Sequence, residues 1–267
     1  MTKFRFTFGL TLLLVILSLT PIGWFNGLLD PSQEQTLGLF LLKNKFYLEP
    51  NTNLPTSLTS QNEKALHLLV ENFKSHNLEL ANLDIEVHIL SSQELNFFAL
   101  PGGILIITRG LLEKVKNLEE LCGIVAHEIA HIQQHQTLKS LSVPIGWFLG
   151  NFLFRPFLKL FRGNEAENPT EFIKLNYSLD DEIEADLKSL DYLRKTKIDP
   201  KGMFRFYQRL NEQETNQNEL SKFKNFLKTH PIDNSRLKRI NTILETKPYA
   251  FDSQFPIQLQ DLREDLQ

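Results

Sequence analysis

The sequence His127-Glu128-Ile129-Ala130-His131 places two histidines four positions apart. If this stretch is helical, both imidazoles lie on one face, one turn apart, and can bind the same metal ion. Together they would fill two of the four tetrahedral positions that zinc usually offers. Glu128 would then lie beside them, where a carboxylate can act as a general base on a water at the metal. The spacing therefore predicts a helix that carries part of a metal site.

The residues around this motif favour a helix. Asn117 followed by Glu120 is typical of a helix start, in which side chains cap the first backbone amides. Apolar residues then recur at helical spacing and predict a buried stripe: Leu121, Cys122, Val125, Ile129 and Ile132. With seven histidines in 267 residues, a chance match to the motif has a probability of roughly one in a hundred. The helical context therefore favours a metal site over coincidence.

Cys122 is the only cysteine of the chain. An internal disulfide and a cysteine-rich zinc finger are therefore excluded. Its place in the apolar stripe predicts a buried structural thiol rather than a nucleophile. The net charge of -3 argues against a nucleic-acid partner.

A second helix is predicted from Ser178, whose spacing to Asp181 is typical of a cap, to about Arg194. Its buried stripe is expected to consist of Ile183, Leu187 and Leu190. Glu182 and Asp186 lie one turn apart on the neighbouring flank.

Acidic residues on a helix usually face solvent, and this is the expectation for Asp180, Asp181 and Glu184. Beside a His-Glu-x-x-His helix, however, Glu182 becomes the natural third metal ligand. Asp186 becomes the acceptor that holds a ligand imidazole in the correct tautomer.

The stretch from Asn96 to Thr108 predicts two strands around a turn at Pro101-Gly102-Gly103. The second strand begins at Ile104 and has two interpretations. At a sheet edge, its unpaired amides would bind an extended peptide, which makes Gly102, Gly103 and Ile104 candidate substrate-binding residues. Alternatively, it is a plain core strand. Residues 84–90 predict a further half-buried strand with His88 on the solvent side.

The amino terminus differs from the rest of the chain. Lys3 and Arg5 precede the 24 uncharged residues from Phe6 to Leu29, a length that can cross a bilayer. A cleaved signal peptide is the alternative, but no Ala-x-Ala site is present and Pro21 follows the small residues. We therefore expect an uncleaved anchor with its basic end inside and the remaining chain outside the cytoplasm.

Residues 141–161 combine many aromatic side chains with a run too short to cross a membrane. Arg155, Lys159 and Arg162 recur at helical spacing beside them. One interpretation is a helix at a bilayer surface, which would add a second contact with membrane lipid. The other is an internal hairpin that covers the site.

Four motifs in this order resemble metallopeptidase family 48, the membrane-associated zinc gluzincins that include HtpX, BepA and the CAAX prenyl protease. The matching pieces are Asn96 to Gly103, His127 to His131, Glu182 to Asp186, and Thr229-His230-Pro231 followed by Arg236. They cover about residues 60 to 245. Two positions depart from the pattern: Leu179 stands where many members have arginine, and Phe97 replaces a common small residue. Local support and the substrate cleft are therefore expected to differ.

The resemblance implies a zinc endopeptidase with one zinc ion per chain. In it, His127, His131 and Glu182 would bind the metal, and Glu128 would act as base and then as acid.

Asp186 and Arg236 would lie behind the metal ligands. His230 would approach the zinc or the developing oxyanion, and in some relatives the equivalent histidine blocks the site.

The implied fold is α+β: a mostly helical zincin-like metallopeptidase fold with a small β-sheet, preceded by one transmembrane helix. We expect an anchor or signal segment at residues 1–29 and a juxtamembrane linker at 30–55. The metallopeptidase domain would comprise residues 56–246, with a carboxyl-terminal tail at 247–267.

The expected substrates are misfolded or unassembled membrane or envelope proteins, and the expected location is a bacterial inner membrane with the catalytic domain facing the periplasm. A rival from another class is a latent or inactive chaperone or assembly factor that keeps zinc and binds clients without cleaving them. The intact Glu128 argues against it, because a purely structural zinc site has no use for that carboxylate.

Overall fold

The computed structural model describes residues 29–46, 61–141, 175, 177–213, 223, 226–247, 250–252 and 255–263. The predicted anchor, apart from Leu29, and nearly all of the aromatic segment 141–161 lie outside these residues. None of the described helices is both long and apolar enough to cross a membrane. The described part is mostly helical with one small sheet, which agrees with the predicted α+β class.

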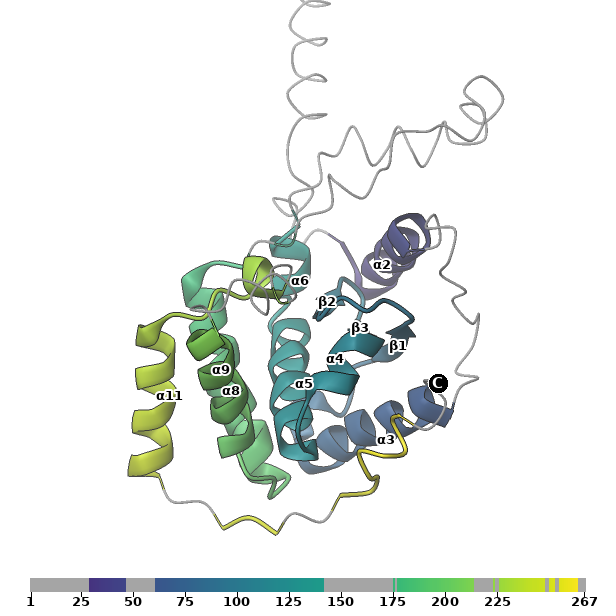
Figure 1. Ribbon diagram of the computed structural model, residues 1–267. Coiled ribbons are helices and arrows are strands. Elements are labelled where there is room, and N and C mark those ends of the chain that lie inside the picture. Colours follow the sequence, from purple (N-terminus) through teal and green to yellow (C-terminus); the bar gives the residue numbers. More distant parts are fainter. Residues whose placement is uncertain are drawn as a thin grey trace, which may run out of the picture.

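The sheet has three strands: β1 (Glu86–Leu90), β2 (Phe97–Leu100) and β3 (Ile104–Thr108). The strand order is β1-β3-β2, with β3 parallel to β1 and antiparallel to β2. The strand that begins at Ile104 is therefore central, so its interpretation as a core strand is confirmed and the alternative of a sheet edge is wrong. Its backbone pairs with strands on both sides, so β1 and β2 are the edge strands. The edge next to α5 belongs to β2 (Figure 1).

Both faces of the sheet are covered, which explains why β3 reads as a continuous apolar run. Leu105 and Ile107 join the large core formed with the central helices, whereas Ile104 and Ile106 pack into a smaller core with the first described helix. That helix is α2 (Pro31–Phe46), in the stretch predicted to be a juxtamembrane linker.

Gly102 and Gly103 form the turn between β2 and β3 with φ angles of 77° and 82°, a backbone conformation that L side chains rarely adopt. A Cβ atom on Gly102 would lie 2.2 Å from Cα of Gln35, and one on Gly103 would lie 2.0 Å from the carbonyl oxygen of Asp84. Turn geometry and packing therefore account for both glycines. Their contact with a substrate stays a prediction.

Gly38 lies in the middle of α2, where this helix meets the same turn. A Cβ atom at this position would lie 2.0 Å from the carbonyl oxygen of Pro101. The helix backbone thus rests directly on the turn, with no side chain between them.

The helices form successive layers beside the sheet (Figure 1). The helix α5 (Leu118–Gln133) contacts β2 on one side and the helices α8 (Leu179–Lys195) and α9 (Lys201–Gln213) on the other. Outside them lies α11 (Asn234–Thr246), while α3 (Gln61–His76) runs beneath the sheet. Three further helices are short: η2 (Leu78–Leu80), α4 (Arg109–Lys114) and α6 (Gln136–Lys139).

Both predicted helix starts are confirmed. The Asn117 side chain accepts a hydrogen bond from the backbone amide of Glu120. Ser178 and Asp181 form a reciprocal capping box at the start of α8. These caps fix where α5 and α8 begin, and so set the rotation of the residues that follow.

Three burial predictions are wrong. Asp181 was expected to face solvent but is buried, because it caps the start of α8 and pairs with Lys139. His88 was expected on the solvent side of its strand but is buried, with its Nε2 2.9 Å from a carboxylate oxygen of Glu86. Leu187 was expected in the buried stripe of α8 but is 41% exposed. The inner face of α8 carries Glu182, Asp186 and Ser189 instead, so polar residues that pair with groups of other elements take the position expected for apolar ones.

The described part of the tail is irregular and contributes to the core. Ile257 and Leu262 are buried in the large core. Arg263 donates hydrogen bonds to the carbonyl oxygens of Leu112 and Val115. The tail therefore closes the core beside α4.

Candidate metal centre

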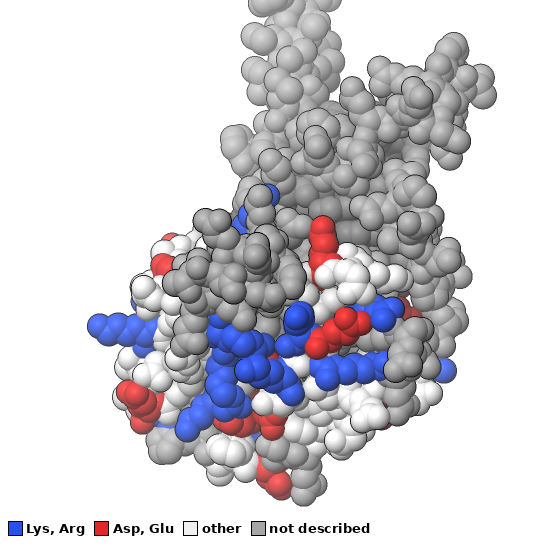
Figure 2. Space-filling view, in the orientation of Figure 1, with Lys and Arg blue, Asp and Glu red and all other residues white. Residues whose placement is uncertain are grey.

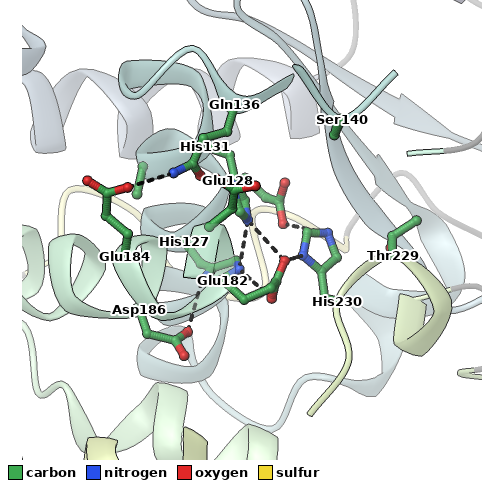
Figure 3. Close-up of polar contacts among 12 residues, drawn as sticks. His127, Glu128, His131, Gln136, Ser140, Glu182, Glu184, Asp186, Thr229 and His230 are labelled. Atoms are coloured by element: carbon green, nitrogen blue, oxygen red, sulfur yellow. Dashed lines mark hydrogen bonds and ion pairs between the residues drawn. The ribbon is translucent and has the colours of Figure 1, made fainter. Parts of the chain in front are cut away.

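Three segments that are distant in sequence bring their side chains to one buried point (Figure 3). His127, Glu128 and His131 come from α5, and Glu182 comes from α8. His230 lies between the helical residues 226–229 and the start of α11. All five are buried, with at most 1% of their surface exposed.

The two imidazoles and the Glu182 carboxylate form a compact triangle. His127 Nε2 lies 3.1 Å from His131 Nε2 and 3.5 Å from one Glu182 oxygen, and His131 Nε2 lies 3.4 Å from the other. Ligands at zinc bond lengths in a tetrahedron would be about 3.3–3.5 Å apart. The spacing of the predicted ligands therefore fits one ion of this size.

His230 stands beside this triangle. Its Nδ1 is 3.0 Å from a Glu182 oxygen, and its Nε2 is 3.2 Å from a Glu128 oxygen. His127, His131, Glu182 and His230 each offer a ligand atom, and these four atoms lie within 4.8 Å of one another. His230 is thus placed both to contact a bound ion and to contact Glu128.

The buried polar atoms also fit a metal. The two oxygens of Glu128 accept no hydrogen bond from the described residues. Such a group is costly to bury without a partner, and a site that binds a cation and its water removes that cost. Two or three imidazoles and one carboxylate form a donor set that suits zinc.

Asp186 and Arg236 lie behind the ligands, as the resemblance implied. An Asp186 oxygen is 3.1 Å from Nδ1 of His127, which turns Nε2 of that ring toward the cluster. Arg236 donates two hydrogen bonds of 2.8 Å to Asp186, and its third nitrogen lies 2.6 Å from Glu182. One guanidinium therefore connects α11 to two acidic residues of α8.

The charges of the site favour a bound cation. Burial tends to raise the pKa of Glu182, but His230, His127 and His131 outweigh it and hold that pKa well below its usual range. Burial likewise acts against ionisation of Asp186, while Arg236 and His127 lower its pKa. Both carboxylates are therefore anionic.

The two ligand histidines differ. Burial alone would lower the pKa of His127, but Asp186 and Glu182 raise it to about 9. For His131, burial is the dominant effect and lowers the pKa. The difference follows from their partners, because only His127 has a carboxylate on its outer nitrogen.

Two residues that contact His131 were not predicted from the sequence. Tyr177 stacks on the His131 ring, with centroids 3.8 Å apart and planes 16° apart. The side-chain oxygen of Gln136 lies 2.6 Å from Nδ1 of His131. Neither position carries a motif, and the only available signal was closeness in sequence to a ligand or a cap.

A cavity of about 310 Å³ lies elsewhere, at the start of α5, and is lined by Lys116, Asn117, Glu120, Arg205, Gln208 and Arg209. Lys and Arg side chains gather on the face shown in Figure 2, with acidic residues among them. Arg209 and Arg205 are already paired with Glu120 and Asp199. This cavity lies about 15 Å along α5 from His127, so it is separate from the histidine cluster. None of the described residues that line it is a histidine, and the cluster therefore remains the candidate metal site.

The model of peptidase family M48 matches residues 60–244, so the chain belongs to this family of metalloproteases. The family predicted from the four motifs is thereby confirmed.

Its curated relatives are named as proteases. It is 27% identical over 175 residues to the beta-barrel assembly-enhancing protease of Yersinia pestis, a match that covers 61% of this chain and 35% of the relative. It is 27% identical over 168 residues to the mitochondrial metalloendopeptidase OMA1 of Bos taurus, with 59% and 32% covered. The matches thus span about a third of the relatives' length.

Proposed function

We propose that this chain is a zinc-dependent endopeptidase in which His127, His131 and Glu182 bind one zinc ion. The observation that carries the proposal is the convergence of two imidazole nitrogens 3.1 Å apart with the Glu182 carboxylate, whose two oxygens lie 3.4 and 3.5 Å from them, spacings close to those between ligands of tetrahedral zinc. Membership of a metalloprotease family supports the same conclusion. When bound, zinc would polarise the scissile carbonyl and acidify a water molecule.

The residues of the chain would then handle the protons. Glu128 sits one step along α5 from His127, with both oxygens free of hydrogen bonds from the described residues, so it can take a proton from water and pass it to the leaving amine. His230 Nε2 lies 3.2 Å from Glu128 and can donate to the developing oxyanion. Asp186 would hold His127 in the metal-binding tautomer.

The proposed substrate is an extended segment of a misfolded or unassembled membrane or envelope protein. The strand β2 is an edge of the sheet and lies next to α5, so we assign strand pairing with the substrate to Phe97–Leu100. The proposed setting is a membrane-anchored chain whose catalytic domain faces away from the cytoplasm, in a bacterial inner membrane facing the periplasm. This setting rests on the amino-terminal sequence.

Cleavage of an unfolded casein-like chain by the purified full-length protein tests the mechanism. Glu128→Gln should keep zinc but lose at least 100-fold in kcat/KM, because a positioned general base contributes about 10²–10⁴-fold. His127→Ala should lose both zinc and activity. The control is Glu113→Gln, whose exposed carboxylate pairs with Arg109 away from the site. Native cleavage rates in zinc-loaded Glu128→Gln would contradict the assigned mechanism.

The second candidate, a latent or non-cleaving chaperone, is favoured by one observation. His230 belongs to the group of four ligand atoms and can complete a closed four-ligand site. X-ray absorption on the zinc-loaded protein separates the two functions. Three histidine nitrogens at the metal indicate the closed form, whereas two indicate a site open to water. His230→Ala should raise cleavage if His230 blocks the site and lower it if His230 stabilises the oxyanion.

A further inference from the structure

A chain of hydrogen bonds leads from His131 away from the cluster to the protein surface (Figure 3). Nδ1 of His131 lies 2.6 Å from the side-chain oxygen of Gln136. The side-chain nitrogen of Gln136 donates in turn to a carboxylate oxygen of Glu184 at 3.1 Å. Gln136 is buried, whereas Glu184 is exposed and was expected only to face solvent.

The chemistry of the three groups fixes the direction of this chain. A carboxylate only accepts hydrogen bonds, so Glu184 must receive the amide N–H of Gln136. The amide oxygen then faces His131 and also only accepts, so Nδ1 of His131 must carry the proton. The other ring nitrogen, Nε2, is left with its lone pair directed at His127 and Glu182. This is the tautomer that a metal ligand requires.

A break between two helices creates the contact. In a continuous helix, residue 136 would be rotated by about 140° from residue 131 and would face away from it. Instead α5 ends at Gln133, and His135 adopts a left-handed conformation with φ of 54°. Gln136 therefore starts the separate helix α6, and its side chain reaches His131.

We propose that Gln136 is the positioning residue for His131, and that Glu184 orients the Gln136 amide. His127 has a charged partner in this role, Asp186, whereas His131 has a neutral one. The inference rests on the proposed metal site, because it assigns the group that prepares one of its ligands.

Three variants of the full chain test the proposal. Gln136→Met keeps the side-chain length but removes the acceptor. The double variant Gln136→Glu with Glu184→Gln restores an acceptor for His131 and a donor from position 184. The control is Gln133→Met. Among the described residues, the side-chain oxygen of Gln133 accepts a hydrogen bond only from Tyr192, so this variant leaves His131 and Gln136 unchanged.

The first readout is the zinc dissociation constant, measured by competition with a chelator. It should rise 10–100-fold in Gln136→Met, as is typical when an outer partner of a ligand histidine is lost. It should stay within about threefold of the native value in the control and in the double variant. Native affinity in folded Gln136→Met would overturn the proposal. If Gln136→Met does not fold, the double variant decides, and a tenfold loss of affinity there overturns it.

The second readout is the ring nitrogen spectrum of ¹⁵N-histidine protein without metal. The native chain and the double variant should show His131 protonated at Nδ1, while Gln136→Met should show a mixture of tautomers. A native ring protonated at Nε2 would refute the role of Gln136. This measurement does not need zinc. A chain that holds this tautomer but binds no zinc would therefore refute the proposed function and leave the positioning role supported.

Discussion

Arg236 supplies the positive charge that allows two acidic residues to be buried together. It is almost fully buried and contacts both Asp186 and Glu182. Its guanidinium carbon also lies over the aromatic ring of Tyr207, 5.3 Å from the ring centroid. Removing one partner of a buried ion pair leaves an uncompensated charge, which typically costs about 3–5 kcal/mol.

We therefore expect Arg236→Met to lower the free energy of unfolding of the metal-free protein by about 3–5 kcal/mol. Zinc should recover part of this loss, because it brings positive charge to Glu182. Urea unfolding with and without zinc measures both effects. Arg239→Met is the matched control, since Arg239 is exposed on the same helix and should change stability by no more than about 0.5 kcal/mol. An equal loss with and without zinc would contradict the electrostatic explanation.

The residues of the site differ in how far the sequence could predict them. Spacing alone placed His127, Glu128 and His131 together, because a helix dictates that geometry. Glu182 and Asp186 required the assumption that a second helix packs beside the first. Arg236 and His230 were implied only by resemblance. Gln136 could not be predicted, because its contact depends on a break between two helices that no motif specifies.

At the scale of elements, the start of α8 determines where Glu182 points. Asp181 caps this start by accepting bonds from the hydroxyl and backbone amide of Ser178. It also lies 2.7 Å from Lys139 of α6. Burial would raise the pKa of Asp181, but Lys139 and Ser178 outweigh it and lower the pKa.

Asp181→Ala should lower the free energy of unfolding at pH 7 by about 1 kcal/mol, the usual cost of a lost cap. Because the folded pKa of Asp181 is depressed, its contribution is present above the pKa of the unfolded chain, about 3.9. It is lost as pH falls through the lower folded pKa. The difference between variant and native protein should therefore shrink below about pH 4 in urea titrations. Asp180→Ala, at the exposed neighbouring position, is the control, and a difference that grows in acid would contradict the assignment.

The same helix shows why a pattern of apolar residues can be misread. Ile183, Leu187 and Leu190 recur at helical spacing, yet only Leu190 is fully buried. The orientation of α8 is fixed by the ion pairs and hydrogen bonds of Glu182 and Asp186, which lie on the flank of that pattern. Where buried polar groups satisfy one another, hydrophobic periodicity no longer identifies the inner face.

At the scale of the whole molecule, α5, α8 and the segment that carries His230 all contribute side chains to the cluster. A bound ion should therefore stabilise the whole described part of the chain. Zinc at 100 times its dissociation constant adds about 2.7 kcal/mol. For a unit of this size, that raises Tm by roughly 5–10 °C. Differential scanning fluorimetry with zinc and with a chelator measures the shift. His131→Ala should show no response, and an unchanged native Tm would contradict metal binding at the cluster.

The fold was predictable at the level of class and element type, and less so in topology. The helices around the caps and the strands around Pro101-Gly102-Gly103 were anticipated because local signals define them. The position of β3 in the centre of the sheet was not, since strand order depends on pairing between segments distant in sequence.

The bare contact of Gly38 with Pro101 has a mechanical consequence. Because the backbones of Gly38 and Pro101 are in direct contact, little side-chain packing can adjust between them. The helix α2 and the turn of the sheet should therefore move together as a rigid body. A pull or tilt applied at Pro31 would be transmitted to β2 and then to α5. Since α5 carries His127, Glu128 and His131, a displacement of α2 would reach the metal centre through β2.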